Sequence, residues 1–475
     1  MTDEQLARLK ADVDAYVDEV WEDVVADIAR LVRHESVEDL GAAEPGKPWG
    51  PASNDALVEA EDIARRLGLD VTDVDGRLGF GDVPGASGPE RYLATIAHTD
   101  IVPLGEGWSF PPLEVTRKDG YLIGRGVQDD KGPFVLSLYA AHFFARRAAA
   151  SETLPYTLRC IIGNNEETGM GDVPYYLERY PEPLFCFSPD ADFPLICGEK
   201  GLYSGEFTSD AVAGEKIVEL DGGTVSNAIP GKATALVRAD ATALPAAERI
   251  SVEDAGEGLA RVSATGVGGH ASMPAGSVNA IGVLARYLLA NDLAGEGERG
   301  FLELLVTLTE DAYGRAAGVA ATDDKFGDLT LVAGVVRTVD GRFTQTVDSR
   351  FPTSTTAEEI TARLTELAAA HGCTYEAGRG EKPFYISPES PEIHVLLDTY
   401  AEYTGREGKA FTIGGGTYAR HFARAVAFGP GGDYESRPEW VGMEHGPDEG
   451  VSEESLRQAL KIYIVSIARL MELEL

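Results

Sequence analysis

Five short clusters of His and carboxylate residues, each placed where an apolar, strand-like run ends, constrain most strongly how this chain can fold. Four of the clusters lie between residues 98 and 192, and the fifth lies near residue 445. If the fifth cluster joins the others at one site, the long segment between them must be inserted into the domain that carries the site.

The pattern of apolar residues up to about residue 200 predicts an α/β fold. Residues 3–33 have apolar side chains in steps of three and four, which predicts a long amphipathic helix. Strand-like and helical patterns then alternate, which favours a sheet with helices on both faces. The other elements expected here are a helix near 55–67, strands at 92–97, 157–162 and 184–187, and a helix at 133–149.

The pattern changes near residue 200 and returns near residue 390. The segment between is richer in short strand-like runs, has one expected helix at 278–291, and holds few candidate ligands. After it, helices are expected near 391–404 and 451–472. We therefore expect a discontinuous metal-binding domain of residues 1–200 and 385–475, with an inserted α+β domain of residues 201–384.

Charge and cysteine content narrow the classes of partner. The chain has 41 Lys and Arg against 78 Asp and Glu, a formal net charge of −37, which disfavours binding to nucleic acid or anionic membranes. Its four cysteines form no C-x-x-C pair, and Cys160 and Cys186 lie in apolar runs, as in a protein of the reducing cytosol. We find no signal peptide, and the longest nearly apolar stretch, 134–145, is too short to span a bilayer. We expect a cytoplasmic protein.

The residue types in the five clusters suit a pair of divalent metal ions. The candidate ligands are His98, Asp129, Glu167, Asp190 and His445. Five such ligands fit two ions that share one bridging carboxylate, for which Asp129 is the candidate. Two further acidic residues, Asp100 and Glu166, are candidates to orient a ligand and to move a proton. Two ions beside an acidic base are typical of hydrolysis by a metal-bound water.

Each cluster also has a structural interpretation when it is taken alone. His98 can be a structural residue at a strand end, and the Asp129-Asp130 pair can be an acidic helix N-cap. Glu166 and Glu167 can belong to a polar turn. Asp190 can cap a turn, and His445 can be an exposed loop residue. The metal interpretation rests on the joint occurrence of all five clusters in a chain with only eight His residues.

The order of the motifs resembles a known family. H-T-D at 98–100, G-R-G-V-Q-D-D-K-G-P at 124–133, E-E-T-G at 166–169, S-P-D at 188–190 and the late E-H at 444–445 resemble the two-metal amidohydrolases. That family includes aminoacylases, carboxypeptidase G and dipeptidase V, and the resemblance is greatest to the dipeptidase V, or carnosinase-like, type. Further similar segments are V-G-G-H-A-S-M-P at 267–274, V-D-S-R-F-P at 347–352 and I-G-G-G-T-Y-A-R at 413–420. The resemblance implies a catalytic domain with a mixed β-sheet flanked by helices, and an inserted α+β lid domain.

The resemblance also implies a role for each metal-site residue. It assigns one ion to His98, Asp129 and Asp190, and the other to Asp129, Glu167 and His445. Glu166 would be the general base, and Asp100 would tune His98. A cis peptide bond is implied after Asp129.

Residues of the inserted domain gain roles only through the resemblance. His270 matches a residue that stabilises the oxyanion, and Asn227 and Arg350 match residues that hold the substrate, with Arg350 at its carboxylate. Gly416 and Thr417 are further candidates for substrate contact. Two segments depart from the family's usual sequence: V-G-M-E-H-G-P-D-E at 441–449 and Asn227-Ala228-Ile229-Pro230.

These features predict a two-metal dipeptidase that acts on small dipeptides. Zinc suits the ligands best, and manganese or cobalt can also serve. Because a large lid replaces the partner subunit in the dipeptidase V type, we expect a monomer. One alternative is a deacylase or desuccinylase of N-acyl amino acids from the same family. Another is an inactive metal-bound binding protein, which would be expected to lack the base or the bridging ligand.

Overall fold

The computed structural model describes residues 1–431 and 437–475, and it separates into two compact units. Unit 1 comprises Met1–Gly198, Tyr385–Phe411 and Thr417–Leu475. Unit 2 comprises Glu199–Phe384 and Thr412–Gly416. In sequence, unit 2 therefore interrupts unit 1.

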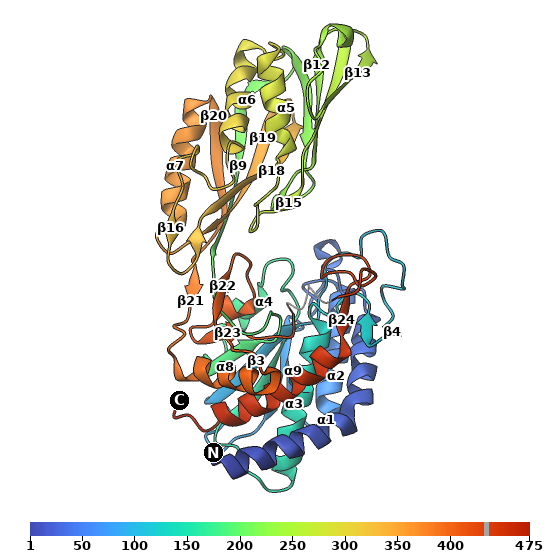
Figure 1. Ribbon diagram of the computed structural model, residues 1–475, viewed down its shortest axis with the longest axis vertical. Coiled ribbons are helices and arrows are strands. Elements are labelled where there is room, and N and C mark those ends of the chain that lie inside the picture. The colour runs from blue at the N-terminus through green and yellow to red at the C-terminus, as the bar shows by residue number, and fades with distance from the viewer. Residues whose placement is uncertain (432–436) are drawn as a thin grey trace. The chain divides into compact units, whose positions relative to one another are not determined.

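A mixed, nine-stranded sheet forms the centre of the described part of unit 1 (Figure 1). The strand order is β1-β2-β6-β3-β7-β23-β8-β21, and β22 pairs with β8. The neighbours β6, β3, β7 and β23 run parallel, whereas β1, β2 and β8 pair antiparallel to theirs. The bounds are β1 Asp70–Val74, β2 Leu78–Val83, β3 Tyr92–His98, β6 Thr157–Gly163, β7 Phe185–Ser188, β8 Ile196–Glu199, β21 Phe384–Tyr385, β22 Phe411–Ile413 and β23 Ala425–Ala427.

Helices cover this sheet and supply much of its core. Every residue of β3, β6 and β7 is buried, as expected for central parallel strands covered on both faces. Helix α3 is buried over most of its length and packs against α1 and α9. The helices are α1 Asp3–Val32, α2 Pro51–Arg66, α3 Lys131–Ala149, α4 Asp172–Leu177, α8 Pro391–Thr404 and α9 Glu453–Leu470.

A small three-stranded sheet joins two distant parts of unit 1. Its strands are β4 Thr116–Lys118, β5 Tyr121–Ile123 and β24 Gly450–Ser452, in the order β24-β5-β4. Gly450 pairs with Ile123, so the segment after β5 and the segment before β24 leave the same end of this sheet. These two segments contain Asp129 and His445.

Unit 2 is an α+β unit with its own hydrophobic core. Its eight-stranded antiparallel sheet has the order β13-β14-β12-β10-β18-β19-β9-β20. Two short ladders, β11 with β15 and β16 with β17, complete its described part. The bounds are β9 Gly201–Val212, β10 Ile217–Gly222, β11 Ala228–Ile229, β12 Lys232–Arg238, β13 Ile250–Gly256, β14 Leu259–Thr265, β15 Gly269–His270, β16 Thr322–Asp323, β17 Gly327–Asp328, β18 Thr330–Val339, β19 Arg342–Phe351, β20 Cys373–Glu381, α5 Ala280–Ala290, α6 Glu296–Leu308 and α7 Ala357–Ala370.

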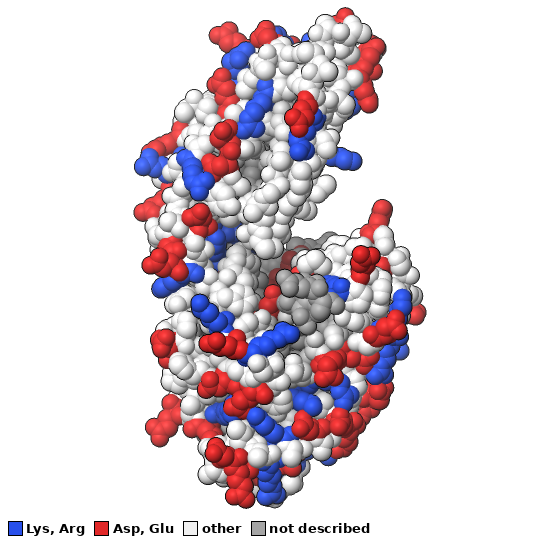
Figure 2. Space-filling model, in the orientation of Figure 1, with Lys and Arg blue, Asp and Glu red and all other residues white. Residues whose placement is uncertain are grey.

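The predicted fold class is confirmed: an α/β unit with a mixed sheet flanked by helices, interrupted in sequence by an α+β unit. Figure 2 shows Asp and Glu spread over the visible face of each unit, with Lys and Arg between them. No helix in the described ranges is both long and apolar enough to cross a membrane.

Candidate metal centre

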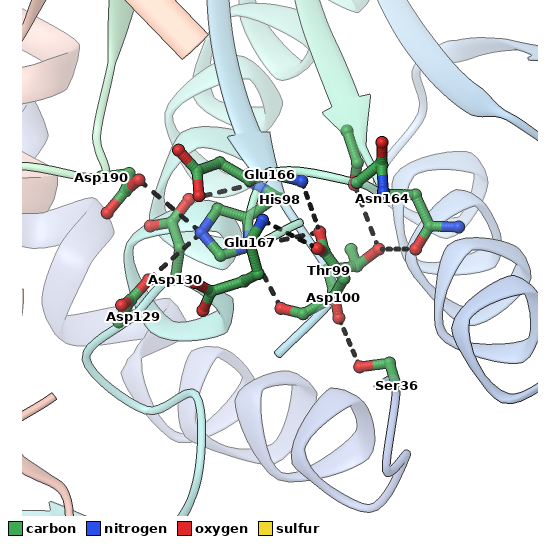
Figure 3. Close-up of polar contacts among 12 residues, drawn as sticks. Ser36, His98, Thr99, Asp100, Asp129, Asp130, Asn164, Glu166, Glu167 and Asp190 are labelled. Carbon is green, nitrogen blue, oxygen red and sulfur yellow. Dashed lines mark hydrogen bonds and ion pairs between the residues drawn. The ribbon is translucent and has the colours of Figure 1, made fainter. Parts of the chain in front are cut away.

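Three of the predicted ligand clusters lie at the carboxyl ends of adjacent parallel strands. His98 is the last residue of β3, and it is level with Gly163 at the end of β6. Glu166 and Glu167 follow β6, and Asp190 follows β7 on the other side of β3. Ligands in α/β folds commonly bind at such strand ends. Figure 3 shows these carboxylates gathered around the His98 imidazole.

Asp129 lies between the two imidazoles. Its Oδ1 is 3.1 Å from His98 Nε2, and its Oδ2 is 2.8 Å from His445 Nε2. Glu167 Oε2 lies 3.3 Å from His445 Nε2, and Asp190 Oδ2 lies 3.6 Å from His98 Nε2. The structure therefore brings all five predicted ligands together, with one carboxylate facing two ligand groups.

The donor atoms fit divalent cations. Two sets have ligand atoms within 4.8 Å of one another: His98, Asp129 and Glu167, and His98, Glu166 and Asp190. Oε1 of Glu167 is buried and has no hydrogen-bond partner among the described residues. Imidazole and carboxylate donors of this kind suit zinc, and carboxylates also suit manganese. In the second set, Glu166 accompanies His98 and Asp190, whereas the family resemblance implies Asp129 as their partner. The Glu166 carboxylate is therefore close to the predicted ligands, as a general base must be.

The surroundings of His98 set which nitrogen faces the carboxylates. Its Nδ1 lies 3.1 Å from the backbone oxygen of Asp100 and 3.5 Å from the Oδ1 atom of the same residue. An Nδ1–H that donates there leaves the Nε2 lone pair for a metal ion. Asp100 also accepts the backbone N–H groups of Glu166 and Glu167, each at 3.1 Å. Asp100 thus organises both the imidazole and the two glutamates.

Several carboxylates are buried close together at this centre, and this raises the pKa values of most of them. Burial, followed by the charge of Asp190, raises the pKa of Glu166 well above its usual range. Burial, followed by the charge of Asp129, raises the pKa of Glu167 to about 7. Burial raises the pKa of Asp190 as well. Bound divalent cations would compensate these buried negative charges, so the centre is suited to metal ions.

The pKa values of the two imidazoles are raised as well, which for an imidazole favours the charged form. Burial disfavours the charged form of His98, but hydrogen bonds with Asp100 and Asp129 outweigh it and raise its pKa. Hydrogen bonds with Asp129 and Glu167 raise the pKa of His445 to about 11. Burial opposes the ionisation of Asp129, yet hydrogen bonds from His445 and His98 lower its pKa. The carboxylate between the imidazoles is therefore the one held ionised.

The segment that carries Asp129 has the backbone feature implied by the family resemblance. The Asp129-Asp130 peptide bond is cis. Asp130 is fully buried, and its Oδ2 accepts the backbone N–H of His98 at 3.1 Å. Asp130 stands at the N-cap of α3 but makes no capping hydrogen bond with its side chain. The interpretation of this acidic pair as a simple helix cap is therefore not supported.

A tyrosine behind the centre was missed by the sequence analysis. The Tyr418 hydroxyl donates to Asp172 Oδ2 at 2.6 Å and accepts the backbone N–H of Asn165 at 3.1 Å. Its ring stands edge-on to His98, with ring centroids 6.3 Å apart. A Cβ at Gly163 would lie 2.3 Å from this ring, so β6 needs glycine at its last position. The only sequence signal was the G-G-G-T-Y-A-R segment, from which Gly416 and Thr417 were chosen instead.

Thr417 and Gly416 fall on either side of the division between the units. Thr417 is the N-cap of the short helix η3 Tyr418–His421, and its hydroxyl accepts the backbone N–H of Ala419 at 3.2 Å. Gly416 belongs to unit 2. The side chain of Thr417 therefore has a local structural contact in addition to its predicted substrate role.

The other predicted substrate residues lie in unit 2. His270 in β15 pairs with Ala228 in β11, and the carbonyl oxygen of Asn227 accepts the N–H of Ala271 at 2.9 Å, so Asn227 and His270 are neighbours. His270 Nδ1 accepts the backbone N–H of Ser272 at 3.2 Å, which leaves Nε2 as the donor of the neutral ring.

Arg350 has two polar contacts inside unit 2. Its Nε and Nη2 donate to the two carboxylate oxygens of Asp348 at 2.8 and 3.2 Å. Its Nη1 lies 3.4 Å from the carbonyl oxygen of Gly414, close to the glycine segment that ends at Gly416. The residues predicted to hold substrate thus form two neighbouring groups, one around β11 and β15 and one around Arg350.

Comparison with known proteins gives a consistent result. The profile of the peptidase family M20/M25/M40 matches residues 94–469. The Beta-Ala-Xaa dipeptidase of Lactobacillus delbrueckii subsp. lactis is 30% identical over 467 residues, covering 94% of this chain and 96% of the relative. The putative dipeptidase YtjP of Bacillus subtilis is 28% identical over 473 residues, covering 94% and 97%.

Two solved structures share the fold over nearly the whole chain. Human carnosine dipeptidase 1 superimposes with a TM-score of 0.61 at 15% identity, covering 98% of this chain and 99% of that one. The Saccharomyces cerevisiae di-peptidase Dug1p gives a TM-score of 0.64 at 11% identity, with the same coverage. The profile match, the full-length relatives and the shared fold together show that this chain belongs to the peptidase family M20/M25/M40.

Proposed function

We propose that this protein is a metal-dependent dipeptidase that hydrolyses the peptide bond of small dipeptides. The observation that carries the proposal is the Asp129 carboxylate, whose two oxygens face two imidazoles from distant parts of the chain. His98 and Asp190 would hold one divalent ion, Glu167 and His445 would hold the other, and Asp129 would bridge them. The two full-length relatives are named as a dipeptidase and a putative dipeptidase, which supports the choice of substrate class.

Two ions held here would act as Lewis acids and lower the pKa of a water bound between them. Glu166 lies in the same cluster as His98 and Asp190, where its carboxylate can accept a proton from the attacking water. Once protonated, the same carboxyl group can pass the proton to the leaving amine. Asp100 keeps Glu166 in place through its hydrogen bond to the backbone N–H.

Residues of unit 2 would complete the site. His270, with Nε2 as its donor nitrogen, would stabilise the oxyanion that forms at the substrate carbonyl. Arg350 would pair with the substrate carboxylate, while Asn227, Gly416 and Thr417 would contact the rest of the substrate. In this proposal unit 1 is the catalytic domain, and unit 2 is a lid whose closure excludes water.

The finer properties follow from the ligand chemistry and the family resemblance. We propose zinc as the native metal, with manganese or cobalt able to replace it. We also propose a monomer, because a large inserted lid takes the place of a partner subunit in the dipeptidase V type. A cytoplasmic location is supported by four cysteines that are all free and buried.

A substrate panel tests the proposal directly. Metal-stripped protein is assayed with α-linked dipeptides, β-alanyl dipeptides, tripeptides and N-acyl amino acids, before and after Zn²⁺, Mn²⁺ or Co²⁺ is restored. We expect hydrolysis of dipeptides that depends on restored metal. Hydrolysis of N-acyl amino acids alone would replace the dipeptidase with a deacylase, and no hydrolysis with any metal would leave a binding protein. Size-exclusion chromatography with light scattering gives the molar mass of the protein and so tests the proposed monomer.

A further inference from the structure

Arg125 and Glu449 form a fully buried ion pair beside the candidate metal centre, and neither residue is a predicted metal ligand. Arg125 Nη1 donates to Glu449 Oε2 at 2.6 Å, and the two side chains are 1% and 0% exposed. The pair joins the segment that leads from β5 to Asp129 with the segment that leads from His445 to β24. Breaking a buried pair leaves an uncompensated charge, so its partners have little freedom to move.

Glu449 shapes the backbone in front of Asp129. Its Oε1 accepts the backbone N–H groups of Gly126, Gln128 and Asp129 at 3.0, 3.0 and 3.2 Å. One carboxylate oxygen thus accepts three N–H groups from the short segment 126–129, the last of them from the proposed bridging residue itself. The position of the Asp129 carboxylate between the imidazoles depends on this backbone path.

Arg125 holds the backbone of His445. Its Nη2 donates to the carbonyl oxygens of His445 and Leu104, each at 3.2 Å, and its guanidinium lies 5.2 Å from the centre of the Trp108 ring. His445 has a backbone φ of 62°, a left-handed conformation that non-glycine residues seldom adopt. Surrounding contacts must maintain such a conformation, and the Arg125 fork supplies one at the carbonyl of this residue.

We propose that Arg125 and Glu449 are positioning residues that set the spacing between Asp129 and His445, and thereby the affinity of the metal site formed by Asp129, Glu167 and His445. Arg125 fixes the His445 backbone, Glu449 fixes the Asp129 backbone, and the ion pair locks the two together. The inference rests on the two-metal centre of the proposed function. The other ion also uses Asp129, but its remaining ligands, His98 and Asp190, lie at the ends of β3 and β7 and not on the two segments that this pair joins, so we expect that ion to be affected less.

The substitution Arg125→Lys tests this inference. A lysine keeps the positive charge beside Glu449, but its single ammonium cannot reproduce the planar fork that also reaches His445. The matched control is Arg159→Lys, which disrupts a different ion pair in unit 1, between the buried Arg159 and the part-buried Asp82, with contacts of 2.8 and 2.7 Å. Glu449→Gln is the second variant, because it removes the charge but keeps an oxygen for the three backbone donors.

Metal binding is measured by titrating each metal-stripped protein with Co²⁺ and following the visible absorption, with far-UV circular dichroism to verify folding. Outer contacts of this kind typically change metal affinity by about 10- to 100-fold. We expect two Co²⁺ per wild-type chain, and in Arg125→Lys an affinity for one ion at least tenfold weaker, with the other changed by less than about threefold. Arg159→Lys should bind both ions like the wild type. If Arg125→Lys does not fold, the same selective loss is expected in Glu449→Gln.

Several results would overturn the inference. They are wild-type affinity for both ions in Arg125→Lys, an equal loss of both ions, or the same loss in Arg159→Lys. If the wild type binds fewer than two Co²⁺, the metal centre and the inference both fail. Dipeptide hydrolysis by the wild type is assayed separately. A wild type that binds two ions but cleaves no peptide refutes the dipeptidase proposal and leaves the inference to be decided by the affinities.

Discussion

Tyr418 and Tyr463 in unit 1 are both fully buried, but their hydroxyl groups differ in their hydrogen bonds. The Tyr418 hydroxyl has two partners, Asp172 Oδ2 at 2.6 Å and the backbone N–H of Asn165 at 3.1 Å. The Tyr463 hydroxyl is buried and has no hydrogen-bond partner among the described residues. Substituting each by phenylalanine removes the same atom from opposite environments, so the pair of variants isolates the hydrogen bonds from the change in side chain.

The loss of stability expected in Tyr418→Phe can be worked out from the two polar groups that lose their hydrogen-bond partner. Burial raises the pKa of Asp172 to about 6, so at pH 8 this carboxylate is ionised and loses a charge-assisted hydrogen bond, which contributes about 1.5–3 kcal/mol. The N–H of Asn165 also loses its acceptor, at a cost of about 1–3 kcal/mol. Allowing for relaxation, we expect Tyr418→Phe to reduce the free energy of unfolding by about 3 kcal/mol. Tyr463→Phe should be neutral or slightly stabilising, because an unpaired buried hydroxyl is removed.

Urea unfolding at pH 8, followed by circular dichroism, compares the two variants with the wild type. Hydrogen exchange of peptides that span residues 163–172 adds a local readout, which should speed up in Tyr418→Phe only. Dipeptide hydrolysis should also fall in that variant, since Asn165 directly precedes Glu166. A loss below about 1 kcal/mol for Tyr418→Phe, or an equal loss for Tyr463→Phe, would refute the reasoning.

Three further substitutions test the metal centre and a buried carboxylate. Glu166→Gln should lower kcat by about 10²–10⁴-fold while both ions remain bound, as checked by steady-state kinetics and elemental analysis; near-normal turnover would remove Glu166 from the mechanism. Asp100→Asn should weaken metal binding about 10- to 100-fold, because the Asp100 carboxylate lies 3.5 Å from His98 Nδ1 and accepts the N–H groups of both glutamates; unchanged affinity in a chelator competition would contradict this role. Burial raises the pKa of Glu61 to about 7, above its unfolded value near 4.5, so its ionisation destabilises the folded state as the pH rises between these values. Relative to the wild type, Glu61→Gln should therefore gain about 3 kcal/mol of stability between pH 4.5 and 8, and a difference in Tm that does not change with pH would disprove it.

The fold of unit 1 was predictable because its patterns are local. The apolar run at Tyr92–Ala97 and the helical pattern at 133–149 became β3 and α3, with bounds within two residues. Strand ends rich in His and carboxylates indicated the metal-site residues, since few structural roles require that combination at five places. In unit 2 the helix at Ala280–Ala290 was expected, but α6 and α7 were not assigned, although Thr356 and Glu359 form a capping box at the start of α7.

The supporting contacts were not predictable, because they join residues far apart in the chain. Tyr418 and Asp172 are 246 positions apart, and Arg125 and Glu449 are 324 positions apart. Without the fold, each looks like an ordinary surface or turn residue. The contact of Arg350 with Asp348 is different, because the two residues are neighbours on one strand and their side chains point to the same face. That ion pair could have been anticipated from the D-S-R sequence, but the interpretation of Arg350 came from the family resemblance alone.

The pairing of β24 with β5 has a consequence for the newborn chain. As the ribosome releases the polypeptide, the segments with His98, Asp129, Glu167 and Asp190 emerge more than 200 residues before His445. The proposed centre therefore stays incomplete until His445 has been synthesised, and a prematurely terminated product that stops before His445 lacks both the last ligand and β24, the strand that docks it. The order of synthesis would thus delay the proposed peptide-cleaving activity until the segments on both sides of unit 2 have been made.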